Sequence, residues 1–187
     1  MGARVRYGLE RGNTVPYPPL FDDIRHNHGF IDTRGRPDRI ASIPEAQESE
    51  ALASLLIMLA APEAPLISLG CDLGQHEVPK ARIRTRRVAG GYVQVISSRR
   101  EAPEAEMAFF KRAGKRLEQG LVGGAGEDHW EINLCLAPVA LKLEDEVDCQ
   151  SIWIWFYAKA STHDRALASR ERLLQVLSKV MSELSYD

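Results

Sequence analysis

The sequence of 187 residues predicts an α+β fold, in which a mostly antiparallel sheet of about five strands carries helices on one face. Two observations lead to this prediction. The last third of the chain reads as two long strands followed by a helix, and the segment before it shows the same succession of strand, strand and helix. Because a further helix and strand precede both units, we expect the order α-β-(ββα)-(ββα) after an irregular N-terminal arm.

The irregular arm is expected to comprise residues 1–42, and residues 43–187 are expected to form a single α+β domain. The arm is rich in proline, glycine, arginine and aspartate, and its turn-forming stretches lie at 15–19 and 32–37. Residues 4–9 could add a short edge strand. The sequence leaves open whether the arm covers an otherwise exposed face of the sheet.

The first helix is expected to begin at Ser42, because the spacing from Ser42 to Glu45 matches a capping box with a proline in the first turn. Its buried stripe has helical spacing and consists of Leu52, Leu55, Leu56 and Leu59. A strand over residues 66–72 follows and leads into a loop.

A hairpin is expected at residues 82–88 and 92–98. The sequence Gly90-Gly91 between these strands would supply the two residues of positive φ that a type I′ turn requires. A second helix is expected at residues 104–119, and the glycine-rich residues 120–127 read as a flexible connector.

The last unit consists of strands over residues 129–143 and 148–160 and a final helix from about Thr162. The second of these strands contains a continuous apolar and aromatic run, residues 152–157. Such runs are typical of strands that are buried on both faces, so we expect this strand at the centre of the sheet.

Residues 129–137 alternate between apolar and polar side chains. One face would carry Trp130, Ile132, Leu134 and Leu136, and the other His129, Glu131, Asn133 and Cys135. A solvent-facing sheet surface is the commonest explanation of this pattern, and a polar row lining a cleft is the alternative.

The neighbouring strand places Trp153, Trp155 and Tyr157 in one row. If the helices cover the opposite face, this aromatic row adjoins Glu131 and needs cover from the arm, a ligand or a partner. Aromatic side chains with a polar group are typical of binding surfaces.

The composition limits the classes of function. A formal net charge of −2 and a pI near 6.2 argue against a nucleic-acid partner. No apolar run has the length of a membrane span, so no membrane partner is expected. Three cysteines and the absence of a secretory signal indicate a reduced, cytoplasmic protein.

Arg84 and Arg86 belong to a group of arginines in the first hairpin. Such a basic surface could bind an acidic partner protein. Like charges also protect edge strands from aggregation, which is the alternative explanation.

No catalytic residue, metal site or cofactor is assigned. His26 and His28 could chelate a metal, but no established metal-site motif accompanies them, and a polar loop is the better explanation. Glu131 or His129 could act as a base only if a pocket surrounds them.

We therefore predict a non-enzymatic binding or interaction protein with a protein partner, for example an inhibitor or an immunity-type protein that neutralises an effector. The alternative is a small-ligand-binding domain with a cleft over the sheet, and the third reading is a hydrolase-type enzyme. The predicted binding residues are Trp153, Trp155, Tyr157, Glu131, Arg84 and Arg86.

Overall fold

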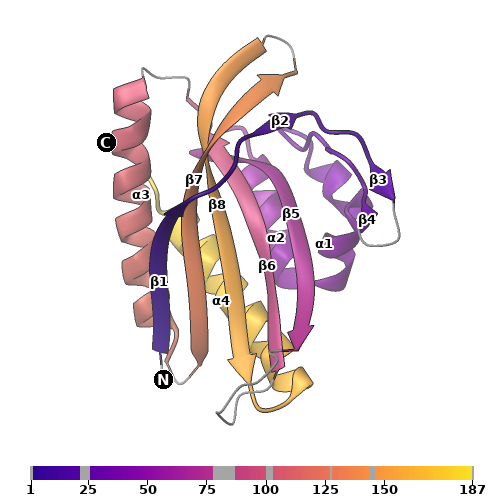
Figure 1. The fold of residues 1–187 in the computed structure, drawn as a ribbon, viewed down its shortest axis with the longest axis vertical. Coiled ribbons are helices and arrows are strands. Elements are labelled where there is room, and N and C mark those ends of the chain that lie inside the picture. The colour runs from indigo at the N-terminus through magenta and orange to yellow at the C-terminus, as the bar shows by residue number, and fades with distance from the viewer. Residues whose placement is uncertain are drawn as a thin grey trace.

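The fold is built around the hairpin of the two longest strands, β7 and β8 (Figure 1). The structure is a computed structural model, and it describes residues 2–21, 26–77, 87–99, 103–126, 128–143 and 146–186. The main sheet has the strand order β1-β7-β8-β6-β5, and β2 also pairs with β7. Its strands are β1 (Gly2–Leu9), β2 (Asn13–Val15), β5 (Leu66–Glu77), β6 (Arg87–Ser97), β7 (His129–Lys142) and β8 (Glu146–Ala160). The aromatic strand β8 lies in the centre, as predicted.

The sheet is mixed rather than mostly antiparallel. Both β1 and β2 run parallel to β7, whereas the pairs β5–β6, β6–β8 and β7–β8 are antiparallel. The short edge strand expected at residues 4–9 is confirmed within β1. Its parallel direction was not predicted, because its partner β7 lies more than a hundred residues away and no turn joins them.

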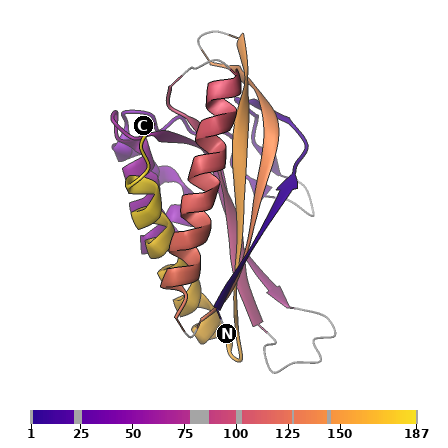
Figure 2. The same cartoon turned by 90° about the vertical axis from the view of Figure 1, so that its left-hand side faces the viewer.

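Helices cover one face of this sheet (Figure 2). They are α2 (Glu50–Ala60), α3 (Pro103–Gly124) and α4 (His163–Ser182), with the short η1 (Pro37–Ser42) and α1 (Pro44–Glu48) before them. The face that they cover, here the inner face, carries Trp130, Ile132, Ile154 and Phe156, all of which are buried. The predicted alternation along β7 is therefore correct, because Glu131 and Asn133 lie on the opposite, outer face.

Gly90 and Gly91 do not form a turn, which corrects the predicted hairpin. Strand β6 runs through both, and neither has a positive φ. A Cβ atom at Gly91 would lie 2.1 Å from the carbonyl oxygen of Asp72, and one at Gly90 would lie 2.8 Å from Cδ1 of Tyr157. Glycine is thus needed because neighbouring strands approach closely. The connection between β5 and β6 falls at residues 78–86, outside the described residues.

Helix α3 is longer than predicted and includes part of the glycine-rich connector. Gly120 and Gly124 face α4, where an added Cβ would lie 2.2 Å from Val180 and 2.8 Å from Val176. These glycines let the two helices pack closely, although glycine usually indicates a loop.

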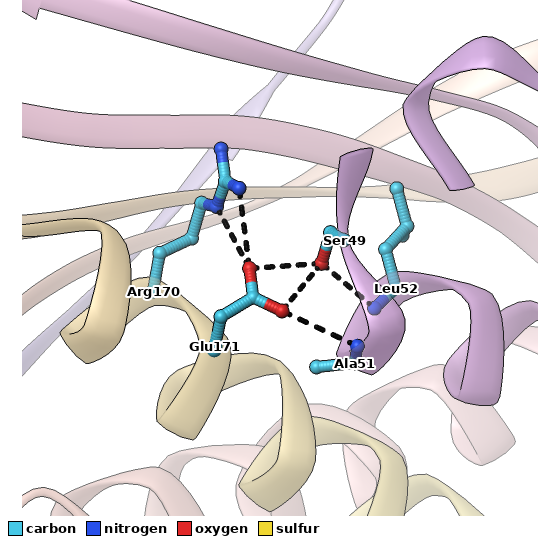
Figure 3. Close-up of polar contacts among 5 residues, drawn as sticks. All are labelled: Ser49, Ala51, Leu52, Arg170 and Glu171. Carbon is cyan, nitrogen blue, oxygen red and sulfur yellow. Dashed lines mark hydrogen bonds and ion pairs between the residues drawn. The ribbon is translucent and has the colours of Figure 1, made fainter. Parts of the chain in front are cut away.

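The first predicted helix is divided into α1 and α2 at Ser49, which caps α2 in place of the predicted cap at Ser42. The Oγ of Ser49 accepts a hydrogen bond from the backbone N of Leu52 (3.1 Å) and donates to the Glu171 carboxylate of α4 (2.8 Å; Figure 3). Arg170, which is almost fully buried, donates to the same carboxylate (3.1 Å). This cluster joins the N-terminus of α2 to α4.

The N-terminal segment is more ordered than an irregular arm and covers part of the outer face. Besides β1 and β2, it contains the small sheet of β3 (Leu20–Phe21) and β4 (His26–Asn27). Val15 is fully buried in a second apolar cluster with Leu69, Ile96, Val139 and Leu141. Residues 13–17 therefore run across the outer face from β7, the partner of β2, to β5, where Tyr17 contacts Leu69 (Figure 1).

Within the described part of the chain, no helix is long and apolar enough to cross a membrane.

Candidate functional site

The outer face presents side chains from all five main strands in register. One transverse row consists of Arg6, Asn133, Trp155, Tyr92 and Asp72. The adjacent row consists of Gly8, Cys135, Trp153, Gln94 and Gly70. The pleat of the sheet therefore places two tryptophans and a tyrosine side by side.

Trp153, Trp155 and Tyr92 form an aromatic cluster at the middle of this face. The two indoles stack with 5.7 Å between ring centroids and an interplanar angle of 13°. The Tyr92 ring lies 4.7 Å from Trp153 and 4.8 Å from Trp155, tilted against both. Because β6 and β8 hold these side chains in register, the cluster is fixed by the sheet.

A cleft of about 800 Å³ lies between the aromatic cluster and the N-terminal segment. We call it the outer cleft. Asn13, Tyr17 and His28 line it from the N-terminal segment, Glu45 from α1, and Asp72 from β5. The aromatic cluster lines it from the sheet, so residues far apart in the sequence share one cavity.

Two polar contacts hold the N-terminal segment over the cleft. The side-chain amides of Asn13 and Gln94 exchange hydrogen bonds of 3.1 and 2.9 Å, and Gln94 also donates to Ser151 (2.9 Å). Tyr17 donates to the carbonyl of Leu69 (3.4 Å). An ideal Cβ at Gly70 would lie 2.7 Å from the Tyr17 hydroxyl, so glycine leaves room for that ring.

The indole nitrogen of Trp153 is buried and has no acceptor among the described residues. A buried donor without a partner costs about 1–3 kcal/mol. Native structures contain few such groups, and each calls for an explanation. The side chain that bears it belongs to the lining of the outer cleft.

Burial disfavours the negatively charged form of three groups that line the cleft, Glu45, Tyr17 and Cys71. Burial, reinforced by Asp72, raises the pKa of the Glu45 carboxyl above its ordinary value. Burial raises the pKa of Tyr17 to about 12, with smaller contributions from Cys71 and Glu45. Burial also raises the pKa of the Cys71 thiol, with smaller contributions from the carboxylates of Glu45 and Asp72. The thiol therefore stays protonated at neutral pH.

Glu131 lies on the outer face but does not line the cleft. Its carboxylate forms ion pairs with Arg6 (3.0 Å) and with Lys159. The hydrogen bond from Lys159, together with the charges of Lys159 and Arg6, holds the pKa of Glu131 below its ordinary value. A carboxylate held in this way is a weak base.

The predicted binding residues are thus divided by the structure. Trp153 and Trp155 line the outer cleft, whereas Tyr157 lines a smaller neighbouring hollow of about 410 Å³, which Trp155 also borders. Arg84 and Arg86 lie outside the described residues, as does the side chain of His26. The sequence analysis did not single out Tyr92, Tyr17, Glu45 or Asp72 as binding residues.

Among the residues that the structure describes, no group of three or more histidine, cysteine, aspartate or glutamate side chains could hold a metal ion. Comparisons of the chain with protein-family models, with curated proteins and with solved structures found no match.

Proposed function

We propose that this chain is a non-enzymatic binding protein that takes up a small molecule in the outer cleft. The observation that carries the proposal is the aromatic cluster of Trp153, Trp155 and Tyr92 at the floor of a cavity of about 800 Å³. Ligand sites are concave, have volumes of roughly 300–1,000 Å³, and combine aromatic walls with a few polar groups.

The cleft is suited to binding because its aromatic side chains are already in place. Each ring packs against the next, and the strands that carry them are paired along their length. A ligand therefore meets a surface that requires little ordering, which lowers the entropic cost of binding.

The electrostatics of the site support binding rather than catalysis. Cys71 lines the cleft, but its raised pKa keeps the thiol protonated and weakly nucleophilic. Glu131 is held as an anion by Arg6 and Lys159, outside the cleft. His129, whose pKa is lowered by burial and by the positive charge of Lys159, does not line the cleft either.

A screen of small fragments by ligand-observed NMR tests the proposal. Fragments that bind the wild-type protein should no longer bind when Trp153 and Trp155 are both replaced by alanine. Tyr157→Ala is the matched control, because Tyr157 does not line the cleft, and the same fragments should still bind this variant. The proposal is contradicted if no fragment binds, or if the hits are indifferent to the double change. Circular dichroism verifies that each variant remains folded.

A partner protein is a second candidate, favoured by the edge strand β1. Leu9 at its end is 85% exposed, and Tyr7 is 60% exposed. An edge strand can pair with a strand of another chain. Native mass spectrometry of the protein purified from its own cells should then show a bound protein that Leu9→Glu removes. A bound protein that remains after Leu9→Glu, or the absence of any bound protein, would argue against a partner that pairs with β1.

A further inference from the structure

The aromatic cluster offers the kind of surface that attracts positive charge. The faces of tryptophan and tyrosine rings carry negative partial charge, and a cation within about 6 Å of a ring centroid is attracted by it. Trp153, Trp155 and Tyr92 lie within 6 Å of one another, and Tyr17 lines the same cavity. Quaternary ammonium groups are recognised through contacts with the faces of aromatic rings.

The charged side chains of the outer cleft have the complementary sign. Glu10, Glu45 and Asp72 contribute three carboxylates, whereas Arg11 contributes the single lysine or arginine charge among the described lining residues. Glu10 and Arg11 are exposed at the same end of the N-terminal segment. Glu45 and the exposed Asp72 line the cleft without an arginine or lysine beside them in the described lining, where the remaining basic side chain is that of His28.

Because Glu45 is partly buried, the charge of a bound ligand determines whether the ligand stabilises or destabilises the Glu45 carboxylate. A neutral ligand would remove more water from Glu45 and supply no compensating charge, and an anionic ligand would be repelled by both Glu45 and Asp72. A cation would instead stabilise both carboxylates. The aromatic and the acidic components of the cleft thus independently favour the same charge on the ligand.

We infer that the outer cleft binds an organic cation, whose alkylammonium head group lies against the aromatic cluster and is paired with Glu45 and Asp72. This inference rests on the proposed function, because it names the chemical class of ligand for the same cleft.

Calorimetric titration with a matched pair of probes tests the inference. Choline carries a trimethylammonium group, and 3,3-dimethyl-1-butanol has the same shape without the charge. We expect choline to bind with an affinity roughly 2- to 30-fold higher than that of its uncharged isostere, the range that cation–π contacts provide.

Carboxylate variants locate the effect. Glu45→Gln and Asp72→Asn should each weaken choline binding by about 5-fold and leave the isostere unchanged. Glu63→Gln is the matched control, because Glu63 is exposed between α2 and β5 and does not line the cleft. Circular dichroism of each variant shows whether the fold is kept.

The outcomes separate the two proposals. If both probes bind equally, or if Glu45→Gln and Asp72→Asn leave choline binding unchanged, the cation inference is wrong and the proposed cleft stands. If neither probe binds while other fragments bind in the screen, the cation inference is also wrong. If no fragment of any charge binds, both proposals fail together.

Discussion

The side-chain amides of Asn13 and Gln94 pair reciprocally, with hydrogen bonds of 3.1 and 2.9 Å. Asn13 belongs to β2 and Gln94 to β6, so the pair spans the outer face above β8. Gln94 is 1% exposed. This contact fixes the start of the segment that encloses the outer cleft, and it links the stability of the segment to the shape of the site.

Replacing Asn13 with alanine should therefore destabilise the protein by about 1–3 kcal/mol, because it leaves part of the buried Gln94 amide without a partner. Thr14→Ala is the matched control, since Thr14 is exposed on the same strand. Urea unfolding measures both free energies. Equal effects of the two changes would show that the amide pair does not hold the segment.

The close approach of strands at Gly91 gives a second prediction. Gly91→Ala should destabilise the fold by at least about 2 kcal/mol, because the new Cβ would collide with the carbonyl oxygen of Asp72. Gly123→Ala is the control, because Gly123 lies in α3 with no atom within 4 Å of an added Cβ. That change should be neutral or stabilising by up to about 1 kcal/mol. Thermal unfolding distinguishes these results, and similar stability of the two variants would contradict the strand assignment.

Coupling between Ser49 and Glu171 is the third prediction. Ser49→Ala should cost about 0.5–2 kcal/mol through loss of the α2 cap. Glu171→Gln should also destabilise, since the buried Arg170 loses its charged partner. Because Ser49 and Glu171 share hydrogen bonds (Figure 3), a double-mutant cycle should give a coupling energy of at least about 0.5 kcal/mol. Additive effects would show that the cluster does not act as a unit.

The fourth prediction concerns pH. The pKa of Glu45 in the folded protein is raised above its ordinary value of 4.5, mainly by burial. The stability that Glu45 contributes is therefore present below pH 4.5 and is lost as the pH rises through the folded pKa. Asp72 and Glu48 reinforce the upward shift, whereas His28 opposes it.

Glu45→Gln should accordingly raise the free energy of unfolding relative to the wild-type protein at pH 7, and the gain should shrink towards pH 4. Urea unfolding at a series of pH values measures it. A gain that is independent of pH, or a loss at pH 7, would show that the carboxyl is not desolvated. Combined with weaker choline binding, the predicted gain would identify Glu45 as a residue kept for the ligand at a cost in stability.

Glu131 should behave in the opposite way. Its pKa is lowered by Lys159 and Arg6, so its contribution to stability is present above its ordinary pKa and is lost as the pH falls through the folded value. Glu131→Gln should therefore lower stability at pH 7 and leave ligand binding unchanged. Titration calorimetry of this variant with choline measures the affinity. A large loss of affinity would show that the binding site includes Glu131 and is not confined to the outer cleft.

The predictable parts of the fold are those with a local periodic signal. Alternation along β7 placed Trp130 and Ile132 on the helix face and Glu131 on the other, and the aromatic run placed β8 in the centre. The position of Trp153 and Trp155 beside the row of Glu131 followed from the same period. The sequence could specify these features because each depends on neighbouring residues alone.

The rest depends on contacts between distant segments. Gly90-Gly91 has the composition of a turn, and only the neighbouring strands show that it is a point of close approach. The parallel pairing of β1 with β7 has no connecting turn to indicate it. Glu45 and Tyr17 join the cleft only because the N-terminal segment crosses the outer face, so no local pattern could mark them as binding residues.

The most direct test of cation binding in the outer cleft is a two-dimensional NMR titration of the three tryptophan indole N–H signals with choline. Trp153 and Trp155 line the cleft, whereas Trp130 is buried on the inner face and bonded to Ser169. We predict that the signals of Trp153 and Trp155 shift saturably while that of Trp130 stays in place. No shift at Trp153 and Trp155, or an equal shift at Trp130, would contradict the binding of an organic cation in the outer cleft.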